Sequence, residues 1–387
     1  FTGLFCVLAL CLSMLPVSAL AAEDAPSNQP TTLLSDDNVA KIEENEYPTL
    51  DEAVNAAEDG ATIELLADAT TKGWNLTKSL TITSAPDLAE KPTVTFEKDG
   101  IALWGKTLTF KGIDVVMNGV GSTPYGEWTW MTICASKDAV LALDNVNMTM
   151  DATGSTGSPH AIYFCSNNKL NLTNGSVLTI KNYPNDALEW DGGDGGYNVN
   201  ITNSTFISDH NRSGFTGTFY ATITNSKVDV VNSLGNGSNG SHFIIEDSEV
   251  NFNNNGSHGL SAGELSIDNS TVNTKNNNGM GITVNNAFTV ENGSIVTVTG
   301  NAGNSNYGYA AVRLYNNYPF TVDSTSELYI EDNNNTGLYV RQGNLTVEDG
   351  AVLKITGNKV SHNLLDGYGG GIYVGYGDNY DPTVILP

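Results

Sequence analysis

A pair of apolar residues separated by one other residue returns at a fixed interval along the middle of the chain. Its second member is an isoleucine, and four of these isoleucines follow one another at intervals of 22 residues: Ile201, Ile223, Ile245 and Ile267. A repeat of about 20–50 residues is typical of solenoids and propellers, in which each unit packs only on its neighbours. We therefore expect a stack of coils, with any binding residues on one face of it.

Each repeat holds three short segments in which apolar and polar residues alternate, as they do along β-strands. The apolar pair comes first, a second segment such as 228–230 follows, and an Asn-rich corner such as 253–256 leads to the third. The third segment often begins with glycine, as at 281–284, 337–340 and 371–374. Three strands with polar corners per coil predict an all-β parallel β-helix, with neighbouring coils about 4.8 Å apart.

The anchor positions continue on both sides of the regular repeats at longer intervals. They are Ile82, Phe110, Leu143 and Leu172 upstream, and Val290, Val322 and Val347 downstream. Asn and Gly suit the corners because they tolerate unusual backbone angles, and stacked Asn amides can pair along a column. Coils longer than 22 residues carry loops, which on a solenoid usually lie on one face, often the binding face.

The two ends of the chain differ from the repeats. Residues 1–21 are apolar and end in a small-residue pattern, so we expect a signal peptide there, shortened at its start because it lacks an initiator methionine. Residues 22–46 are acidic and polar, and we expect a flexible linker. The β-helix is expected over 47–387, and because 383–387 looks like a new strand we expect the natural chain to continue.

One helix is expected at the start of the β-helix. Thr49 and Glu52 have the spacing of a capping box, and Gly60 follows the apolar stripe. We predict a short amphipathic helix within 48–60 that covers the open end of the stack, where strand edges would otherwise stay unpaired.

Acidic residues far outnumber basic ones. The 43 Asp and Glu against 17 Lys and Arg give a formal charge of −26. Such a charge argues against nucleic acid and anionic membranes as partners. Together with the signal peptide it favours a protein that is secreted or displayed at the cell surface, with no membrane insertion of the mature domain.

Two cysteines remain after removal of the signal peptide, Cys134 and Cys165. They end similar segments, 131–134 and 162–165, and are therefore expected on adjacent coils. Neighbouring strands lie within reach of a disulfide, which an exported protein can keep. The alternative is two half-buried thiols that pack as small apolar groups. The sequence leaves both open.

Residues 47–63 and the repeats over 80–355 resemble the right-handed parallel β-helix proteins of the pectin-lyase-like group, and more narrowly the secreted or surface β-helix proteins of gut-type bacteria. The resemblance covers residues 47–387 and implies a right-handed coil. The group includes polysaccharide lyases, glycosidases, phage tailspikes and adhesins, so the resemblance implies no single activity.

The polygalacturonases of this fold carry four elements: Asn-Thr-Asp, Asp-Asp, Gly-His-Gly and Arg-x-Lys. The segment 257–261 is similar to the third and Asn185-Asp186 to part of the first, but no Asp-Asp pair lies between them and no Arg-x-Lys follows. Glycoside hydrolysis needs two carboxylates about 5–10 Å apart around the bond. We therefore interpret His258 as an ordinary polar residue that enters a coil.

A second cluster follows from stacking the third segments of three consecutive coils. The alignment gives three columns: Ile133, Phe164 and Trp190; Thr129, His160 and Asp186; and Thr132, Tyr163 and Glu189. Strict alternation points the last column outward, and the middle column joins it only if a corner bend falls between the two. Adjacent coils then bring the catalytic candidates Glu189, Asp186 and His160 within about 5 Å, close enough to shift one another's pKa values.

Other side chains surround this cluster. The loops 119–126 and 151–159 stand beside it, and His210 lies on the next coil. The ligand-binding candidates are Tyr163, Trp128, Trp130, Asp191 and Arg212, with the indoles as faces for sugar rings. The alternative is a solvated sheet face with Trp190 in the core.

Calcium is the one cofactor that the sequence suggests. Asp191 and Asp194 lie in a Gly-rich turn close to Asp186 and Glu189, and such clustered oxygen ligands suit Ca²⁺. The spacing matches no EF-hand, so the alternative is an acidic turn and a protein without any cofactor.

The sequence favours a non-enzymatic surface protein, an adhesin or glycan-binding module whose partner is an extracellular glycan or another cell-surface ligand. Its polar outward faces, its acidity and its incomplete catalytic set support this hypothesis. The alternative is a glycoside hydrolase or polysaccharide lyase that acts near Glu189 and Asp186. A passive stalk that displays a further domain is the third possibility. Convergent acids walled by loops would favour the enzyme, and a shallow face without them the adhesin.

Overall fold

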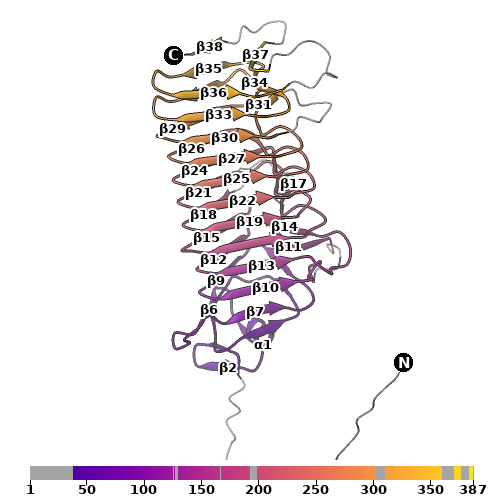
Figure 1. Ribbon diagram of the computed structural model, residues 1–387. Helices are drawn as coiled ribbons and strands as arrows, with labels where there is room; N and C mark the ends of the chain where they lie inside the picture. The colour runs from indigo at the N-terminus through magenta and orange to yellow at the C-terminus, as the bar shows by residue number, and fades with distance from the viewer. Residues whose placement is uncertain are drawn as a thin grey trace, which may run out of the picture. The chain divides into compact units, whose positions relative to one another are not determined.

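The computed structural model describes residues 38–124, 126, 130–165, 167–191, 198–301, 310–359, 370–375 and 383–386, all within one compact unit. The predicted signal peptide over 1–21 and most of the predicted linker lie outside the described residues. Within them, the chain winds into a stack of coils whose strands form three parallel sheets (Figure 1). The apolar core lies inside this stack. The predicted fold class, an all-β parallel β-helix of three-strand coils with a short N-terminal helix, is confirmed.

Each coil contributes a strand to each of three faces, which we call sheet A, sheet B and face C. The strands of sheet A are β3 (Ala61–Leu65), β6 (Leu80–Ser84), β9 (Thr107–Lys111), β12 (Val140–Asp144), β15 (Lys169–Thr173), β18 (Asn198–Thr202), β21 (Tyr220–Thr224), β24 (Ser241–Glu246), β26 (Leu260–Asp268), β29 (Phe288–Glu291), β32 (Pro319–Val322), β35 (Asn344–Val347) and β38 (Thr383–Ile385). Those of sheet B are β4 (Ala69–Thr71), β7 (Thr93–Phe96), β10 (Asp114–Asn118), β13 (Asn147–Asp151), β16 (Val177–Lys181), β19 (Thr205–Asp209), β22 (Lys227–Val231), β25 (Glu249–Asn253), β27 (Thr271–Lys275), β30 (Ile295–Thr299), β33 (Glu327–Glu331) and β36 (Val352–Thr356).

Face C carries the third segments. Its strands are β5 (Trp74–Leu76), β8 (Ile101–Trp104), β11 (Met131–Ser136), β14 (His160–Cys165), β17 (Leu188–Asp191), β20 (Phe215–Thr216), β23 (Ser238–Asn239), β28 (Ile282–Val284), β31 (Ala310–Leu314), β34 (Thr336–Val340) and β37 (Ile372–Val374). Strand β26 runs from face C into sheet A without a break, so it pairs with both β28 and β29. The predicted glycine-led segments at 281–284, 337–340 and 371–374 are β28, β34 and β37.

The predicted anchors form one continuous column inside sheet A. Ile201, Ile223, Ile245 and Ile267 pair in register from coil to coil. The column continues through every predicted upstream and downstream anchor, from Ile82 to Val347. All of these side chains are at most 2 % exposed. The register was predictable because the apolar residues recur at a regular spacing, and a slip of one residue would turn this column of side chains from the core to the solvent.

The N-terminal cap is built from one helix and one hairpin. Helix α1 (Leu50–Ala56) begins after Thr49, whose Oγ1 accepts the Glu52 N–H at 3.2 Å, as the capping pattern predicts. The antiparallel strands β1 (Ala40–Ile42) and β2 (Asn45–Tyr47) precede it, and β1 pairs with the outer edge of β3. The linker prediction for 22–46 is therefore wrong at its carboxyl end, because residues 38–46 belong to the folded unit. Among the described residues, no helix has the length and apolar composition needed to cross a membrane.

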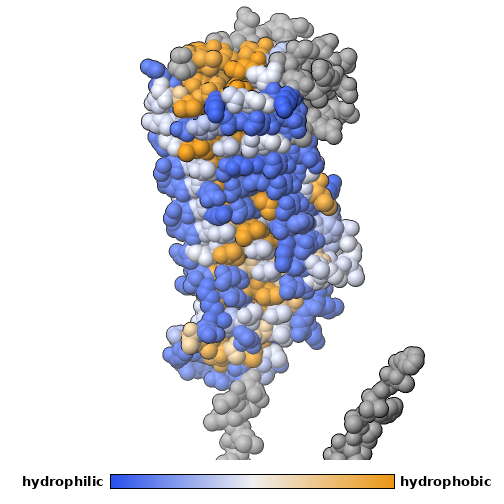
Figure 2. Space-filling view, viewed as in Figure 1, coloured by the Kyte–Doolittle hydropathy of each residue, from blue (hydrophilic) through white to orange (hydrophobic). Residues whose placement is uncertain are grey.

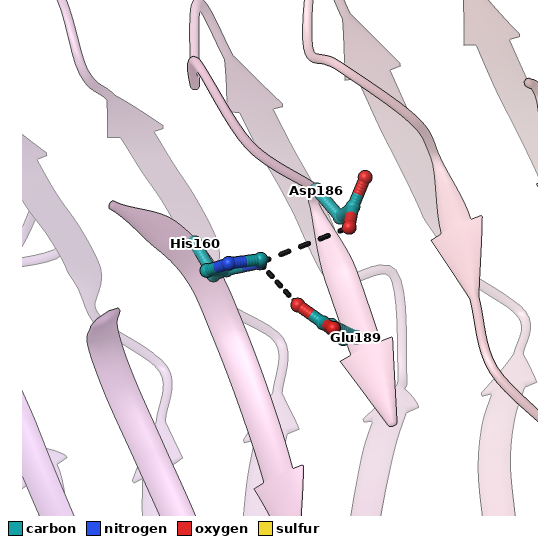
Figure 3. Close-up of side chains that lie close together, drawn as sticks. All are labelled: His160, Asp186 and Glu189. Atoms are coloured by element: carbon teal, nitrogen blue, oxygen red, sulfur yellow. Dashed lines mark ion pairs between the residues drawn. The ribbon is translucent and has the colours of Figure 1, made fainter. Parts of the chain in front are cut away.

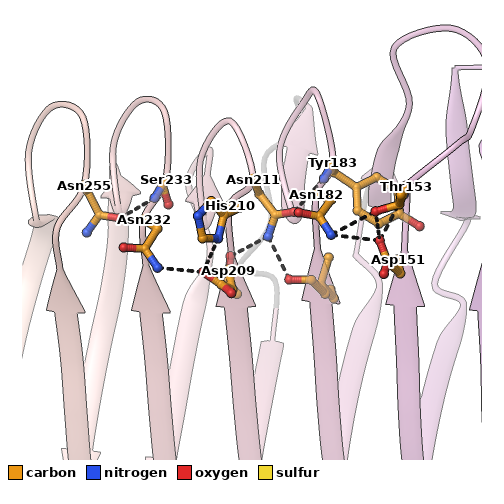
Figure 4. Close-up of polar contacts among 12 residues, drawn as sticks. Asp151, Thr153, Asn182, Tyr183, Asp209, His210, Asn211, Asn232, Ser233 and Asn255 are labelled. Atoms are coloured by element: carbon orange, nitrogen blue, oxygen red, sulfur yellow. Dashed lines mark hydrogen bonds and ion pairs between the residues drawn. The ribbon is translucent and has the colours of Figure 1, made fainter. Parts of the chain in front are cut away.

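Polar side chains bind successive coils together at the corner between sheet B and face C (Figure 4). Asn232 Nδ2 donates to Asp209 Oδ1 at 2.8 Å, and Asn182 Nδ2 donates to Asp151 Oδ1 at 2.9 Å. Both asparagines have a positive φ, 55° at Asn232 and 61° at Asn182. Asn adopts this left-handed region more readily than most residues, which explains why the corners are rich in it.

A glycine just before a strand of face C leaves space for side chains of the neighbouring coil at the corner. A Cβ on Gly281 would lie 2.5 Å from Val298 Cγ1 and 2.7 Å from Asn301 Nδ2. The close approach of buried side chains therefore requires glycine at this position.

The outer surface is mostly polar, as Figure 2 shows for one side, and apolar residues gather there at the carboxyl end of the stack. A hollow of about 500 Å³ opens at that end, lined by Val347, Leu353, Ile355, Ile372 and other apolar residues. The charged and polar residues elsewhere suit a solenoid whose outward side chains face water.

The two cysteines of the folded unit are free thiols, although both lie on face C. Cys134 pairs in register with Tyr163, whereas Cys165 pairs with Ser136. Adjacent strands therefore hold the two cysteines two positions apart. Cys134 packs with Met131 and Tyr163, and Cys165 packs against this small cluster. Of the two open alternatives, the structure has the pair of packed thiols.

Candidate functional site

The predicted cluster lies on face C, where β11, β14 and β17 stack. Tyr163 pairs with Glu189 and Phe164 with Trp190, as the alignment predicted. The alignment of the preceding coil is wrong by two residues, because Ile133 pairs with Ile162 instead of Phe164. Thr132 therefore does not continue its column, and Thr129 lies outside the described residues. A slip of two residues keeps the apolar alternation intact, so the sequence pattern could not exclude it.

A corner bend brings His160 and Asp186 to the outer side of face C. Two consecutive residues face the core on each of the two coils: Ala161 and Ile162 in β14, and on the next coil Ala187 and Leu188, where β17 begins. This break in alternation reverses the side chains that come before it. His160 and Asp186 consequently lie on the same outer side as Tyr163 and Glu189. The sequence pattern predicted this arrangement only if a corner bend fell between the two columns.

Three side chains converge at this bend (Figure 3). His160 Nδ1 lies 3.8 Å from Asp186 Oδ2 and contacts Glu189 Oε2. One nitrogen or oxygen atom from each residue lies within 4.8 Å of the other two. His160 is 9 % exposed and Asp186 is 3 % exposed, so the cluster is largely shielded from water. We call His160, Asp186 and Glu189 the triad.

Burial dominates the ionisation of Asp186. It raises the pKa of that carboxyl above its ordinary value, and the negative charge of Glu189 adds to the effect. A hydrogen bond from Ser213 and the nearby His160 and Arg212 lower the pKa but do not cancel the burial. Asp186 therefore holds a proton more readily than an ordinary aspartate does.

Aromatic side chains border the triad. Trp130 is 41 % exposed, and its ring meets His160 edge to face at 5.6 Å and Tyr163 at 4.8 Å between centroids. Tyr163 Oη donates to Asp191 Oδ2 at 2.6 Å. Burial and this hydrogen bond raise the pKa of the Tyr163 hydroxyl well above its usual range, so it stays protonated and keeps donating.

Of the other predicted residues, Arg212 lies near the triad, His210 stands at a corner, and two cannot be placed. Arg212 Nη1 donates to Asn185 Oδ1 at 3.5 Å, in the turn that leads to Asp186. His210 instead stands at the corner shown in Figure 4, with its Nδ1 2.7 Å from Asp209 Oδ1. Trp128 and Asp194 lie outside the described residues.

The sequence pattern did not single out Ser213 and Asn185 as part of the site. Ser213 bonds to the Asp186 carboxyl from the following coil. Asn185 Nδ2 donates to Ser158 O at 2.5 Å, which ties the loop 151–159 to the triad's turn. The Asn-Asp pair at 185–186 was the only signal for this connection, and polar residues of this kind are too common in the repeats to stand out.

His258 has the structural role that the sequence favoured. Its Nδ1 accepts the Met280 N–H at 3.0 Å, and its own N–H donates to Asn236 Oδ1 at 3.1 Å. Burial, with the positive charge of Arg313, lowers the pKa of His258 below its usual value. A neutral histidine that accepts a backbone hydrogen bond joins two coils here.

A concave surface apart from the triad lies at the corner between sheets A and B. It has a volume of about 520 Å³ and is lined by Asn203, Asn225, Lys227, Asp247, Glu249, Asn269 and neighbouring residues. Its amides bond to one another along the stack, as Asn225 Nδ2 does to Asn203 Oδ1 at 2.5 Å. The described residues that line this groove are polar and include no aromatic side chain, so we regard the face C site as the stronger candidate for a ligand.

No protein family, no curated protein and no solved structure matches this chain.

Proposed function

We propose that this protein is an exported surface protein that binds an extracellular glycan through face C, around Trp130 and the triad. The observation that carries the proposal is the exposed Trp130 ring beside buried carboxyl, imidazole and phenol groups. Sites for small polar ligands combine an aromatic surface with a few polar groups that fix orientation. A sugar ring offers an apolar C–H face for the indole and hydroxyl groups for the polar side chains.

The negative charge of the chain and the export suggested by its first residues support an extracellular glycan that is neutral or bound to cations. The chain has a formal charge of −26, which disfavours anionic membranes and nucleic acid. The apolar segment 1–21 with its small-residue end favours export. Calcium remains a proposed cofactor at Asp191, whose carboxylate also accepts the Tyr163 hydrogen bond.

The test is retention of the purified protein on a panel of immobilised polysaccharides and mucins, with and without calcium. We expect Trp130→Ala to weaken retention on the bound glycan by about tenfold or more, equivalent to about 1.4 kcal/mol. Tyr220→Ala is the matched control, because Tyr220 is also 41 % exposed and stacks on a histidine, His242, at 4.4 Å. Equal loss in both variants, or retention on no glycan, would contradict the proposal.

Polysaccharide cleavage is a second candidate, favoured by the convergence of Asp186 and Glu189. Two nearby carboxyls, of which Asp186 has a raised pKa, suit acid and base roles. Release of reducing ends, together with unsaturated-uronate absorbance, measures hydrolysis and elimination on the same panel. Cleavage that disappears in Glu189→Gln would establish an enzyme, and retention without cleavage would leave the binding function.

A further inference from the structure

The triad combines ligand types that divalent metal ions take in proteins. It offers one imidazole nitrogen and two carboxylate oxygens, from His160 in β14, Asp186 just before β17 and Glu189 within β17. His160 and Glu189 belong to the paired strands β14 and β17, and the Asp186 carbonyl accepts the Ala161 N–H at 3.1 Å. A site on strands is more rigid than one on loops, which favours a preformed set of ligands.

Two atoms of the triad are buried without a hydrogen bond. Among the described residues, neither His160 Nδ1 nor Glu189 Oε2 has a hydrogen-bond partner, although the two atoms contact each other. The contact satisfies the distance for an ion pair but not the geometry of a hydrogen bond. Buried polar atoms normally have partners, and those that lack one call for an explanation such as an ion between them.

The distances leave room for a small cation after a modest movement. Donor atoms around an ion with bonds of about 2.0–2.2 Å lie about 3–4 Å from one another. His160 Nδ1 and Asp186 Oδ2 are already 3.8 Å apart. Glu189 must withdraw slightly from His160, and its side chain, 22 % exposed, faces enough solvent to do so.

The residues around the triad resemble the supporting shell of a metal site. Ser213 bonds to the Asp186 carboxyl, and the Trp130 and Tyr163 rings pack against the His160 ring. Groups of this kind orient metal ligands and limit the access of water.

We propose that His160, Asp186 and Glu189 bind a divalent transition-metal ion of the zinc class. A nitrogen ligand with two carboxylates suits Zn²⁺ or Mn²⁺, whereas Ca²⁺ and Mg²⁺ prefer oxygen ligands alone. Two carboxylates also balance the charge of a divalent ion in a shielded position. This inference goes beyond the glycan-binding function and does not depend on it.

The experiment is calorimetric titration of the chelator-treated whole protein with Zn²⁺, and separately with Mn²⁺ and Ca²⁺. We expect one Zn²⁺ per chain, with a Kd in the micromolar range or below. His160→Ala and Glu189→Gln should each weaken Zn²⁺ binding at least tenfold. Since Glu189 is partly exposed, the conservative Glu189→Gln keeps the fold, which circular dichroism checks.

His242→Ala is the matched control. Within the part of the chain that the structure describes, His242 Nδ1 is also buried without a hydrogen bond, and Glu264, whose Oε2 lies 3.5 Å away, is the one carboxylate paired with it. We expect Zn²⁺ binding to be unchanged in this variant. Absence of stoichiometric Zn²⁺ binding, equal binding by Glu189→Gln, or tighter binding of Ca²⁺ than of Zn²⁺ would overturn the proposal. Trp130→Ala removes no ligand of the metal, so the two proposals can fail separately.

Discussion

Asn255 and Asn277, one coil apart, are joined by two hydrogen bonds to the same oxygen: Asn277 Oδ1 accepts from Asn255 N and from Asn255 Nδ2, each at 2.9 Å. The same relationship continues through Asn301 and Asn333 to Asn358. Each of the last four amides also donates back to a carbonyl of the preceding coil, as Asn277 Nδ2 does to Phe252 O at 2.8 Å. This buried column ties the coils together along the corner.

Asn277→Ala is expected to destabilise the protein by about 3 kcal/mol or more. The change leaves the buried Asn255 backbone N–H and the Phe252 carbonyl without these partners, at about 1–3 kcal/mol each. It also removes one of the two hydrogen bonds of Asn255 Nδ2, which keeps Val230 O as an acceptor at 3.4 Å. The adjacent Asn278 is exposed, so Asn278→Ala should change stability by about 0.5 kcal/mol or less. Urea unfolding of both variants provides the measurement. Similar losses in the two would mean that the column contributes little.

Ile245→Ala and Ile244→Ala should differ sharply although the residues are neighbours in β24. Ile245 is 0 % exposed within the anchor column, whereas Ile244 is 41 % exposed. Truncating the buried isoleucine costs about 2–5 kcal/mol, because it removes apolar contacts and leaves a cavity. The Ile244→Ala change should lower the free energy of unfolding only slightly, because this side chain faces the solvent. Guanidinium unfolding that gave the larger loss for Ile244→Ala would show that the register is shifted by one residue.

The fold was predictable because its determinants repeat. The recurring apolar pair and its intervals predicted both the column from Ile82 to Val347 and the three-strand coil. The structure confirms the column, because each member is buried. The start of the unit was less predictable. Strands β1 and β2 lie in an acidic stretch that has the composition of a linker, yet they pair with each other and with β3.

The site was predictable only in part, because its register depends on loops of unequal length. Tyr163 and Glu189 were aligned correctly, whereas Ile133 was aligned with Phe164 instead of Ile162. The bend at Ala161 has no sequence signal, since alanine fits either side of a sheet. A register shift of two residues also decides whether Cys134 and Cys165 lie opposite each other, so the sequence could not decide whether they form a disulfide.

The stability contribution of His258 should depend on pH. The pKa of His258 is lowered in the folded protein, so the unfolded chain takes up a proton first as the pH falls below about 6.5. Its contribution is therefore complete above that pH and declines as the pH falls toward the folded value. At pH 7.5, His258→Gln should be less stable than wild type, because the Met280 N–H loses its present acceptor. The difference in the free energy of unfolding between wild type and His258→Gln should shrink by up to about 1.4 kcal/mol per pH unit on going to pH 5. Thermal unfolding across this range checks it, and a gap that widened in acid would be incompatible with a neutral His258.

Cys134 and Cys165 should resist alkylation in the folded protein at pH 8. Burial raises the pKa of Cys134 to about 12 and that of Cys165 to about 11, so neither thiol is ionised enough to react readily. Both should react after denaturation. Mass spectrometry of the two cysteine-containing peptides measures this, and recovery of a disulfide-linked pair would contradict the packed-thiol arrangement.

Titration of Glu189→Gln and of Lys227→Ala with one retained oligosaccharide tests the proposal that the ligand binds on face C around the triad. Lys227 lines the polar groove between sheets A and B, so it reports on the competing surface. We predict that Glu189→Gln weakens binding by about tenfold or more and that Lys227→Ala leaves it unchanged. Weakened binding in Lys227→Ala, with full affinity in Glu189→Gln, would contradict the account and assign the ligand to that groove.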